Sequence, residues 1–315
     1  MSGHGNAEGW TVRAAGPADA PAVSALTRAA FAGQAGLSPP PGGIRESVAT
    51  VAGNLETFGG LVLTDPCGEL LAALRFTRDG PLWWVRRVSV HPAHQRRGLG
   101  AHLMAAAAEV ASEHRATALR CGVRLALAGN ERFYALLGFR MLARHDFWGE
   151  WGLPLPRLVS TPDEMRVLGA RLAGVLSPGD VVILDGPLGA GKTVFAQGVG
   201  AGLGVTGPVT SPTFVISRRH RGERADLLHA DAYRLGGRVE LEDLDLDSEL
   251  AGAVAVVEWG SGRAEGLAPD RVMVRIERPD TPGTGTDDDA EPRRVTLTAE
   301  GPAAGDRQRL LDALR

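Results

Sequence analysis

Residues 181–193 read Val-Val-Ile-Leu-Asp-Gly-Pro-Leu-Gly-Ala-Gly-Lys-Thr. The apolar residues predict a buried strand, and the stretch after them fits the pattern G-x-x-x-x-G-K-T, which predicts a loop leading into a helix. Glycines let such a loop turn its backbone amides toward a triphosphate, while the lysine reaches the β- and γ-phosphates and the threonine hydroxyl binds Mg²⁺. The strand–loop–helix context favours this interpretation over a glycine-rich turn that only packs.

Lysine usage supports the same interpretation. Of the 34 Lys and Arg residues only Lys192 is a lysine, so the remaining 33 are arginines. A planar guanidinium does not fit where a compact ammonium must sit among phosphates. This gives a chemical reason for lysine to persist at this one position.

Composition limits the class of protein. The chain has 315 residues, which favours two domains, and its 44% hydrophobic and 23% charged content is typical of a folded protein. A net charge of −3 provides no basic field for nucleic acid or an anionic membrane, and two cysteines exclude a disulfide scaffold or a cysteine-rich zinc site. The apolar runs are too short to span a bilayer and residues 1–9 do not resemble a secretory signal, so we expect a cytoplasmic protein.

Alternating strand and helix patterns predict an α/β protein with two domains, at residues 10–150 and 158–315. Gly149–Val159, with two prolines and two glycines, is predicted to link them. The clearest elements of the first domain are strands at 60–64, 69–77, 82–90 and 117–125 and a helix at 98–114. Those of the second are a helix capped by Thr161, apolar strands at 181–184 and 251–257, a hairpin tip at Pro279–Pro292, a strand at 295–298 and a helix at 306–314.

Two carboxylates of the second domain stand where a nucleotide site needs acids. Glu258 ends the apolar strand 251–257, the position of an acid that holds Mg²⁺ in such a sheet. Asp231 follows the strand-like residues 225–228, and Ser211–Phe214 is a turn with two hydroxyls. Taken singly, Glu258 also fits a solvated strand end and Asp231 a turn aspartate.

The strings G-P-L-G-A-G-K-T, S-P-T-F, H-A-D-A-Y-R and V-E-W occur in this order and closely resemble the TsaE family. Members of this family are small P-loop ATPases needed for threonylcarbamoyladenosine synthesis on tRNA. The resemblance covers residues 160–315, including the acidic segment Glu240–Glu249. It implies ATP and Mg²⁺ as cofactors, partner proteins of the TsaB and TsaD type, and an indirect relation to tRNA. The nucleotide-binding residues that it implies are Gly186, Leu188, Gly189, Ala190, Gly191, Lys192 and Thr193.

The same resemblance implies roles for the polar residues outside the loop. Thr193 and Glu258 would hold the metal ion, Glu258 and Asp231 would be the catalytic acids, and the Ser211–Phe214 turn would act as a switch beside the γ-phosphate. Pro187 departs from the family, which usually has a polar or acidic residue at this position. Because proline removes one backbone donor, we expect an altered phosphate affinity.

Two further patterns in the second domain need separate interpretations. Gly202–Gly207 fits the dinucleotide fingerprint G-x-G-x-x-G, but it follows a helix and not a strand, so it is interpreted as a glycine-rich helix end. Arg218–Arg221 is a basic run that fits either a tRNA contact or a solvated hairpin tip, and the hairpin tip is favoured.

The first domain contains a second predicted anion site. The strand 82–90 leads through His91-Pro-Ala-His-Gln-Arg-Arg-Gly-Leu-Gly100 into a helix, so that backbone amides, the helix dipole and two arginines face one ligand. This turn, with Asn130-x-x-Phe-Tyr134-x-x-x-Gly138-Phe139 after it, resembles the GNAT acetyltransferases over residues 10–148. The resemblance implies a GNAT-like mixed sheet with flanking helices and acetyl-CoA as the cofactor.

The GNAT resemblance also implies site residues. Tyr134 would be catalytic and would protonate the departing thiolate, although a core tyrosine is the alternative. The residues implied to hold acetyl-CoA are Val88, Val90, Arg96, Arg97, Gly98, Leu99, Gly100, Ala101 and Asn130. The sequence identifies neither the general base nor the amine that accepts the acetyl group.

Together these patterns predict an ATP-binding and ATP-hydrolysing subunit for tRNA threonylcarbamoylation, fused to an acetyl-CoA-dependent N-acetyltransferase domain. The first alternative is an N-acetyltransferase whose P-loop domain is only a nucleotide-gated docking module. The second is a small-molecule kinase, which would need an arginine-bearing lid; Arg263 and Arg271 are the candidates for it.

Overall fold

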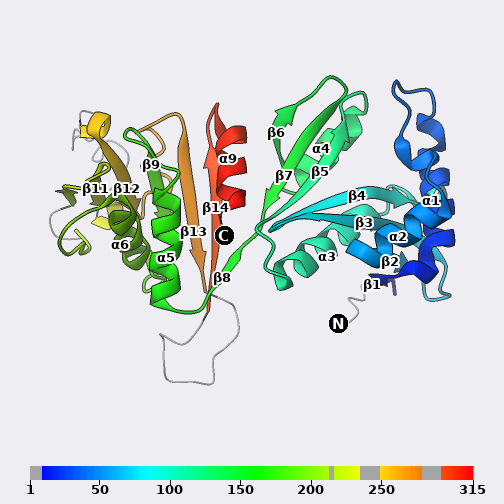
Figure 1. Ribbon diagram of the computed structural model, residues 1–315, viewed down its shortest axis with the longest axis horizontal. Helices are drawn as coiled ribbons and strands as arrows, with labels where there is room; N and C mark the ends of the chain where they lie inside the picture. The colour runs from blue at the N-terminus through cyan, green and yellow to red at the C-terminus, as the bar shows by residue number, and fades with distance from the viewer. Residues whose placement is uncertain (1–8, 213–215, 235–248, 279–291, 315) are drawn as a thin grey trace. The chain divides into compact units, whose positions relative to one another are not determined.

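The computed structural model describes residues 9–212, 216–234, 249–278 and 292–314. It divides the chain into two compact units, Met1–Leu155 and Pro156–Arg315 (Figure 1). Among the described residues, no helix is long and apolar enough to cross a membrane.

The N-terminal unit is built on a seven-stranded sheet with the order β1-β2-β3-β4-β5-β7-β6. Its strands are β1 (Thr11–Ala15), β2 (Gly60–Thr64), β3 (Leu70–Asp79), β4 (Leu82–Val90), β5 (Ala118–Arg124), β6 (Arg140–Arg144) and β7 (Trp148–Pro154). Its helices are α1 (Ala20–Phe31), α2 (Val48–Phe58), α3 (Leu99–Glu113) and α4 (Ala128–Leu136). The sheet is mixed, since β4 and β5 are parallel while the other described neighbours are antiparallel.

The parallel pair β4–β5 opens the sheet. The two strands pair only where Leu82–Val85 faces Ala118–Cys121, and Figure 1 shows them diverging beyond that point. In the same region β4 has two residues, Arg87 and Val88, opposite Leu74 of β3, and Arg87 adopts a positive φ of 54°. Among the described residues, the backbone at the end of β4 beyond Val85 therefore has no strand partner on the β5 side.

The structure corrects the predicted linker. Gly149–Val159 is not a linker, because residues 148–154 form β7, which pairs with both β5 and β6. Residues 157–159 form β8 (Arg157–Val159) at the edge of the second sheet. The glycines of β7 make room for neighbours: a Cβ on Gly152 would lie 2.6 Å from a Leu142 methyl carbon. A composition typical of linkers therefore reflects close packing in a strand.

The C-terminal unit has a second seven-stranded sheet, with the order β10-β11-β12-β9-β13-β14-β8. Its further strands are β9 (Val181–Asp185), β10 (Ser217–His220), β11 (Asp226–Asp231), β12 (Ala253–Glu258), β13 (Arg271–Glu277) and β14 (Arg293–Glu300). Its α-helices among the described residues are α5 (Pro162–Ala173), α6 (Lys192–Leu203) and α9 (Ala304–Ala313). The four central strands β11, β12, β9 and β13 are parallel, so their carboxyl ends meet at one edge.

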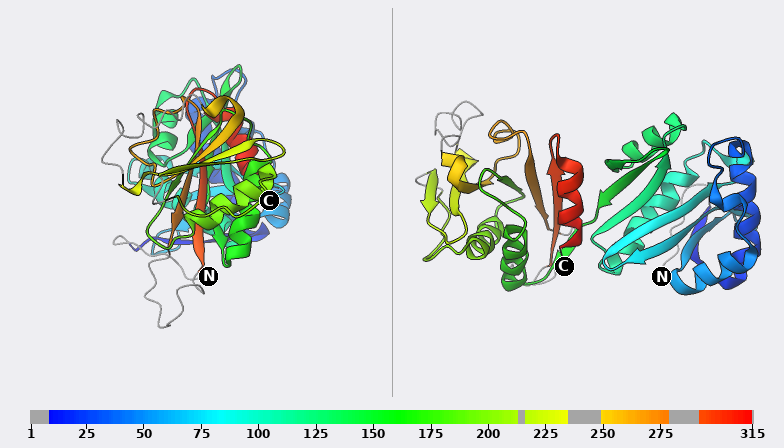
Figure 2. Two further views of the ribbon diagram at one scale, coloured as in Figure 1. Left: turned by 90° about the vertical axis from the view of Figure 1, so that its left-hand side faces the viewer. Right: turned by 45° about the horizontal axis from the view of Figure 1, so that its top comes forward.

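Helices α5 and α6 pack side by side on the sheet (Figures 1 and 2). Thr161 caps α5 as expected, accepting a hydrogen bond from the Glu164 amide at 3.1 Å, while the Glu164 carboxylate accepts from the Ser160 amide. Gly198 lets the helices approach closely, because a Cβ there would lie 2.2 Å from the Arg166 carbonyl oxygen. This packing fixes α6, the helix that begins at Lys192.

Among the described residues, five elements are not anticipated by the sequence patterns: α2, β7, β8, β10 and β13. In contrast, the strand at 82–90 matches β4, and the helix at 98–114 matches α3 within one residue at each end. Gly202–Gly207 begins within α6 and contains its left-handed cap Gly204, which confirms the interpretation as a helix end. Arg218–His220 lie in β10, so the hairpin tip begins only at Arg221.

Candidate functional site

The loop 186–191 connects β9 to α6 at the carboxyl edge of the second sheet. Gly186 and Gly191 have φ values of 152° and 104°, conformations that residues with a Cβ rarely adopt. A Cβ on Gly186 would also lie 2.3 Å from the Ile276 carbonyl oxygen of β13. The loop is therefore held close to the sheet by positions that only glycine fits, while Leu188 at its tip is exposed.

The Lys192 ammonium lies inside this loop. Nζ donates to the carbonyl oxygens of Gly186 at 2.7 Å and Pro187 at 2.9 Å, and it lies 3.5 Å from the centre of the Trp259 ring. Burial lowers the pKa of Lys192 below its ordinary value, although the carboxylates of Glu258, Asp231 and Asp185 act in the opposite direction. The only lysine of the chain is thus placed where its charge would meet phosphates bound in the loop.

Thr193 and Glu258 meet behind the loop. The Thr193 hydroxyl donates to the Glu258 carboxylate at 2.8 Å, and Glu258 also contacts His229 Nε2 at 2.9 Å. Glu258 is only 3% exposed, so it is not a solvated strand end. No cluster of three or more His, Cys, Asp or Glu in the described ranges is arranged for a metal. One hydroxyl and one carboxylate nevertheless fit Mg²⁺, which takes few protein ligands when phosphates and waters supply the others.

Asp231 lies beside Glu258 on the neighbouring strand, because the two residues are register partners of β11 and β12. Its carboxylate accepts from the Ser211 hydroxyl at 3.2 Å and from the Tyr233 amide at 2.9 Å, and the residue is buried. The structure thereby brings Ser211 of the expected switch to Asp231. Residues 213–214 of that turn, residues 240–248 of the acidic segment and residues 279–291 of the expected hairpin tip lie outside the described residues.

A pocket of about 100 Å³ adjoins the other side of the loop. Gly189, Ala190 and Gly191 line it from the loop, Thr161 and Met165 from the start of α5, and Arg293 from β14. Sequence patterns did not identify the residues outside the loop, because they come from distant segments.

Neither arginine proposed for a kinase lid is available for that role. Arg263 donates to the carbonyl oxygens of Ala232 at 2.9 Å and Trp259 at 3.2 Å. Arg271 pairs with Glu300 at 2.8 Å across β13 and β14. Both guanidiniums hold parts of the C-terminal unit together, which removes the sequence basis of the kinase alternative.

His229 begins the string H-A-D-A-Y-R, but the sequence patterns predict no role for it in this site. It is fully buried in β11, its Nε2 contacts Glu258, and its Nδ1 has no hydrogen-bond partner among the described residues. The signal was present in the sequence, since a single imidazole interrupts the otherwise apolar stretch that precedes Asp231. Trp259, the last residue of the string V-E-W, also had no predicted role; its backbone has a left-handed φ of 58°, and its ring lies against Lys192.

The N-terminal unit contains a cavity of about 530 Å³, here called the first cavity. It lies where the end of β4 meets the N-terminus of α3. Of the ten residues predicted from the GNAT pattern, all except Arg97 line it: Val88, Val90, Arg96, Gly98, Leu99, Gly100, Ala101, Asn130 and Tyr134. Arg97 instead contacts His94 Nδ1 at 3.0 Å and lies 5.5 Å from the Trp10 ring centre. Two adjacent arginines point in different directions because the turn is tight.

Tyr134 links this cavity to a smaller one of about 160 Å³, the second cavity. Phe31, Gln34, Val88 and Asn130 also line both, and Phe31 and Gln34 were not predicted. Burial raises the pKa of Tyr134, and the nearby Cys121 thiol adds to the effect. The hydroxyl therefore keeps its proton at neutral pH, as a proton donor must.

Comparison with known proteins assigns both units to families. Residues 159–284 match the family Threonylcarbamoyl adenosine biosynthesis protein TsaE, and residues 43–139 match the Acetyltransferase (GNAT) family. The chain is 54% identical over 140 residues to the tRNA threonylcarbamoyladenosine biosynthesis protein TsaE of Streptomyces coelicolor, covering 44% of this chain and 91% of the relative. It is 47% identical over 148 residues to the protein of that name from Mycobacterium bovis, covering 44% of this chain and 86% of the relative.

Among solved structures, the chain is similar to the ribosomal-protein-S18-alanine N-acetyltransferase from Escherichia coli, with 21% identity and a TM-score of 0.39. The match covers 46% of this chain and 94% of that chain. The family matches confirm the two-domain α/β fold predicted from the sequence. The chain belongs to the TsaE family of tRNA threonylcarbamoyladenosine biosynthesis proteins through its C-terminal unit, and its N-terminal unit is a GNAT acetyltransferase domain.

Proposed function

We propose that the C-terminal unit binds and hydrolyses ATP with Mg²⁺ and so supports threonylcarbamoylation of tRNA in the cytoplasm. Its partners would be transfer proteins of the TsaB and TsaD type, through which it would act on tRNA indirectly. The observation that carries this proposal is the convergence of Lys192, Thr193, Glu258 and Asp231 at the carboxyl edge of the second sheet. Together these side chains would serve three tasks of phosphoryl transfer: binding the phosphates, holding Mg²⁺ and positioning the attacking water.

The residues of the site would divide the work as follows. Lys192 would exchange the carbonyl oxygens of its own loop for the β- and γ-phosphates, since both are acceptors for the same ammonium. Thr193 and Glu258 would hold Mg²⁺, which supplies charge neutralisation at the phosphates when bound. Asp231, oriented by Ser211 and the Tyr233 amide, would position the attacking water.

For the N-terminal unit we propose transfer of an acetyl group from acetyl-CoA to an amine. Backbone groups of Val88 and Val90 would hold the pantetheine arm, and the turn from Arg96 to Ala101 would hold the pyrophosphate at the start of α3. In the transfer, the amine nitrogen bonds to the acetyl carbon and loses one proton, while the carbon–sulfur bond breaks. Tyr134 would give the leaving sulfur its proton, and the proton lost by the amine would restore the tyrosine.

Reconstitution tests the main proposal. The full chain, the transfer proteins, ATP, Mg²⁺ and unmodified tRNA should yield modified tRNA, and Lys192→Ala should abolish both ATP turnover and modification. Arg171→Ala, which changes an exposed arginine in the last turn of α5, is the control and should behave as the wild type. Tyr134→Phe in the same assay tests the alternative in which acetylation is the main activity. Under our proposal tRNA modification does not depend on Tyr134, so this variant should modify tRNA as the wild type does. Modification that persists in Lys192→Ala would overturn the proposal.

A further inference from the structure

The second cavity lies where β4 and β5 diverge, beside Tyr134 and Asn130. Because Tyr134 lines both cavities, a thioester whose CoA portion occupied the first cavity would present its acetyl group toward the second. The second cavity is therefore the place from which an acceptor amine would approach. Its volume of about 160 Å³ is below the roughly 300–1,000 Å³ of sites for drug-sized ligands, which favours a small acceptor.

The charged side chains that line the second cavity are both cationic, Arg87 from the bulge of β4 and Arg124 from the end of β5. No Asp or Glu among the described residues lines it. A cavity with two guanidiniums and no carboxylate disfavours polyamines and other polycationic acceptors, because their charges would be buried against like charges.

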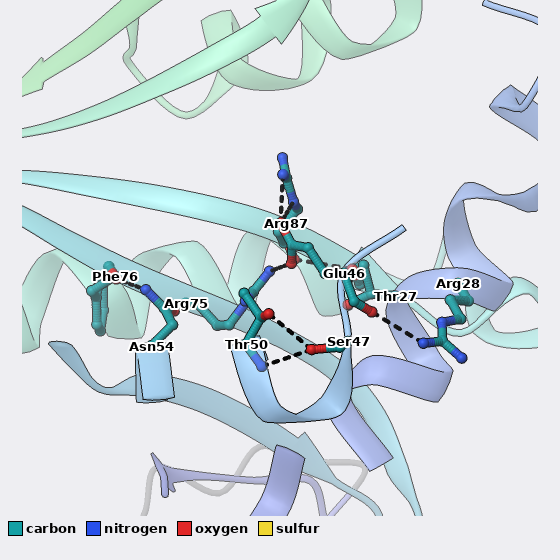
Figure 3. A network of polar contacts seen from close by, with 10 residues as sticks. Thr27, Arg28, Glu46, Ser47, Thr50, Asn54, Arg75, Phe76 and Arg87 are labelled. Carbon is teal, nitrogen blue, oxygen red and sulfur yellow. Dashed lines mark hydrogen bonds and ion pairs between the residues drawn. The ribbon is translucent and has the colours of Figure 1, made fainter. Parts of the chain in front are cut away.

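Glu46 compensates one of these arginines from outside the cavity. Its carboxylate accepts from Arg87 at 2.6 and 3.0 Å and also pairs with Arg75, as Figure 3 shows. Burial alone would raise the pKa of Glu46, but the two guanidiniums hold it below its ordinary value. Glu46 thus stays ionised and fixes Arg87, and it is a poor candidate for the base that takes the proton of the amine.

Arg124 has no such compensation. It donates to the Pro39 carbonyl oxygen at 2.6 Å and lies 4.9 Å from the Phe147 ring centre, and among the described residues it has no carboxylate partner. The ring and the carbonyl hold the guanidinium in place while leaving its charge uncompensated. A guanidinium fixed in this way matches the planar arrangement of a carboxylate or two oxygens of a phosphate.

We propose that the acceptor of the N-terminal unit is a small primary amine that carries an anionic group, and that Arg124 binds this group in the second cavity. This inference rests on the proposed acetyl transfer. The anionic group would lie at Arg124 while the amine faces the junction beside Tyr134. Arg87 would add favourable potential but, being paired with Glu46, would contribute less to recognition.

The test uses the full chain with acetyl-CoA and matched acceptor pairs that differ in the anionic group. The standard amino acids are each compared with their amides, and phosphoethanolamine with ethanolamine, by release of the CoA thiol. We expect at least one acid to exceed its amide about tenfold or more in kcat/KM, and the two kinds of pair distinguish carboxylate from phosphate. Spermidine and a peptide ending in an amide serve as cationic and macromolecular acceptors.

Substitutions test whether Arg124 is the source of the preference for anionic acceptors. Arg124→Gln should reduce the preference to less than about threefold, mainly by raising KM for the acceptor, and Arg124→Lys should restore part of it. Arg144→Gln, an exposed arginine of β6 that lines neither cavity, is the control.

Calorimetry with acetyl-CoA on the same samples separates the two proposals. Three results would overturn the acceptor inference if acetyl-CoA still binds: equal transfer to acids and amides, preferred transfer to spermidine or the peptide, or transfer to none of the acids. In each case the assignment of acetyl-CoA as the donor would stand. A failure to bind acetyl-CoA would remove the proposed transfer itself. A preference that survives in Arg124→Gln would show that Arg124 is not its source.

Discussion

Glu258→Ala is the substitution whose effect follows most directly from the geometry of the nucleotide site. The carboxylate accepts from the Thr193 hydroxyl at 2.8 Å and contacts His229 Nε2 at 2.9 Å. Thr193 is half-buried and can turn its hydroxyl to water, whereas His229 is fully buried and its Nδ1 has no partner in the part of the chain that the structure describes. The alanine variant therefore leaves a buried imidazole with no partner at either nitrogen.

The expected loss of stability follows from that one orphaned group. A buried donor that loses its partner costs about 1–3 kcal/mol, and removal of a buried carboxylate returns part of this by ending its desolvation. We expect Glu258→Ala to destabilise the C-terminal unit by roughly 1–3 kcal/mol, and Glu258→Gln, which retains an acceptor oxygen, by less than about 1 kcal/mol. Both variants lose the charge that we propose holds Mg²⁺, so both should weaken Mg²⁺-dependent hydrolysis by at least about 10-fold.

Scanning calorimetry measures the stability effect. The transition of the C-terminal unit is identified as the one that Mg-ATP stabilises in the wild type, by about 2.7 kcal/mol at 100 times Kd. A double variant, His229→Leu with Glu258→Ala, removes both partners. Its loss of unfolding free energy should be smaller than the sum of the two single losses by about 1 kcal/mol or more. Wild-type stability and wild-type Mg²⁺ dependence in Glu258→Ala would refute the reasoning, as would strict additivity in the double variant.

Three further outcomes are expected. Mg-ATP should block acylation of Lys192 and leave the α-amino group reactive, whereas acetyl-CoA should protect neither amine. Because burial lowers the pKa of Lys192, its labelling should begin at a lower pH than that of an ordinary lysine. Equal labelling of Lys192 with and without Mg-ATP, measured by peptide mapping, would contradict the phosphate-loop role. ATP turnover by the isolated chain should be slow and should rise when the transfer proteins are added, by up to ~10³–10⁵ if they supply an arginine, whereas an unchanged rate would count against partner activation. Tyr134→Phe should lower the rate of acetyl transfer by about 10²–10⁴-fold without weakening acetyl-CoA binding. Because burial raises the pKa of Tyr134, transfer by the wild type should persist to a higher pH than an ordinary tyrosine would allow. Full activity in the variant would exclude a proton-donor role for Tyr134.

Local sequence was sufficient for the elements whose signals are contained in one stretch. The loop 186–191 lies between β9 and α6 because an apolar run, spaced glycines and Lys192 occur within 13 residues. The turn before α3 was also predicted from local sequence, since Gly98 and Gly100 mark it. Nine of the ten residues inferred from the GNAT pattern line the first cavity. Such signals depend on backbone conformation and short spacing, which the order of residues fixes directly.

Tertiary structure alone decided which distant residues meet. No local pattern places His229 against Glu258, which lies 29 residues further along the chain, or pairs Glu46 with Arg87, 41 residues away. The strand β7 has two glycines and a proline, a composition typical of a linker, and only the neighbouring Trp151 and Leu142 side chains explain why the glycines belong in a sheet. Arg96 and Arg97 are adjacent and chemically alike, yet only Arg96 lines the cavity. Sequence determines the conformations available to each segment, whereas the partner of a side chain depends on strand order and packing, which are properties of the whole folded unit.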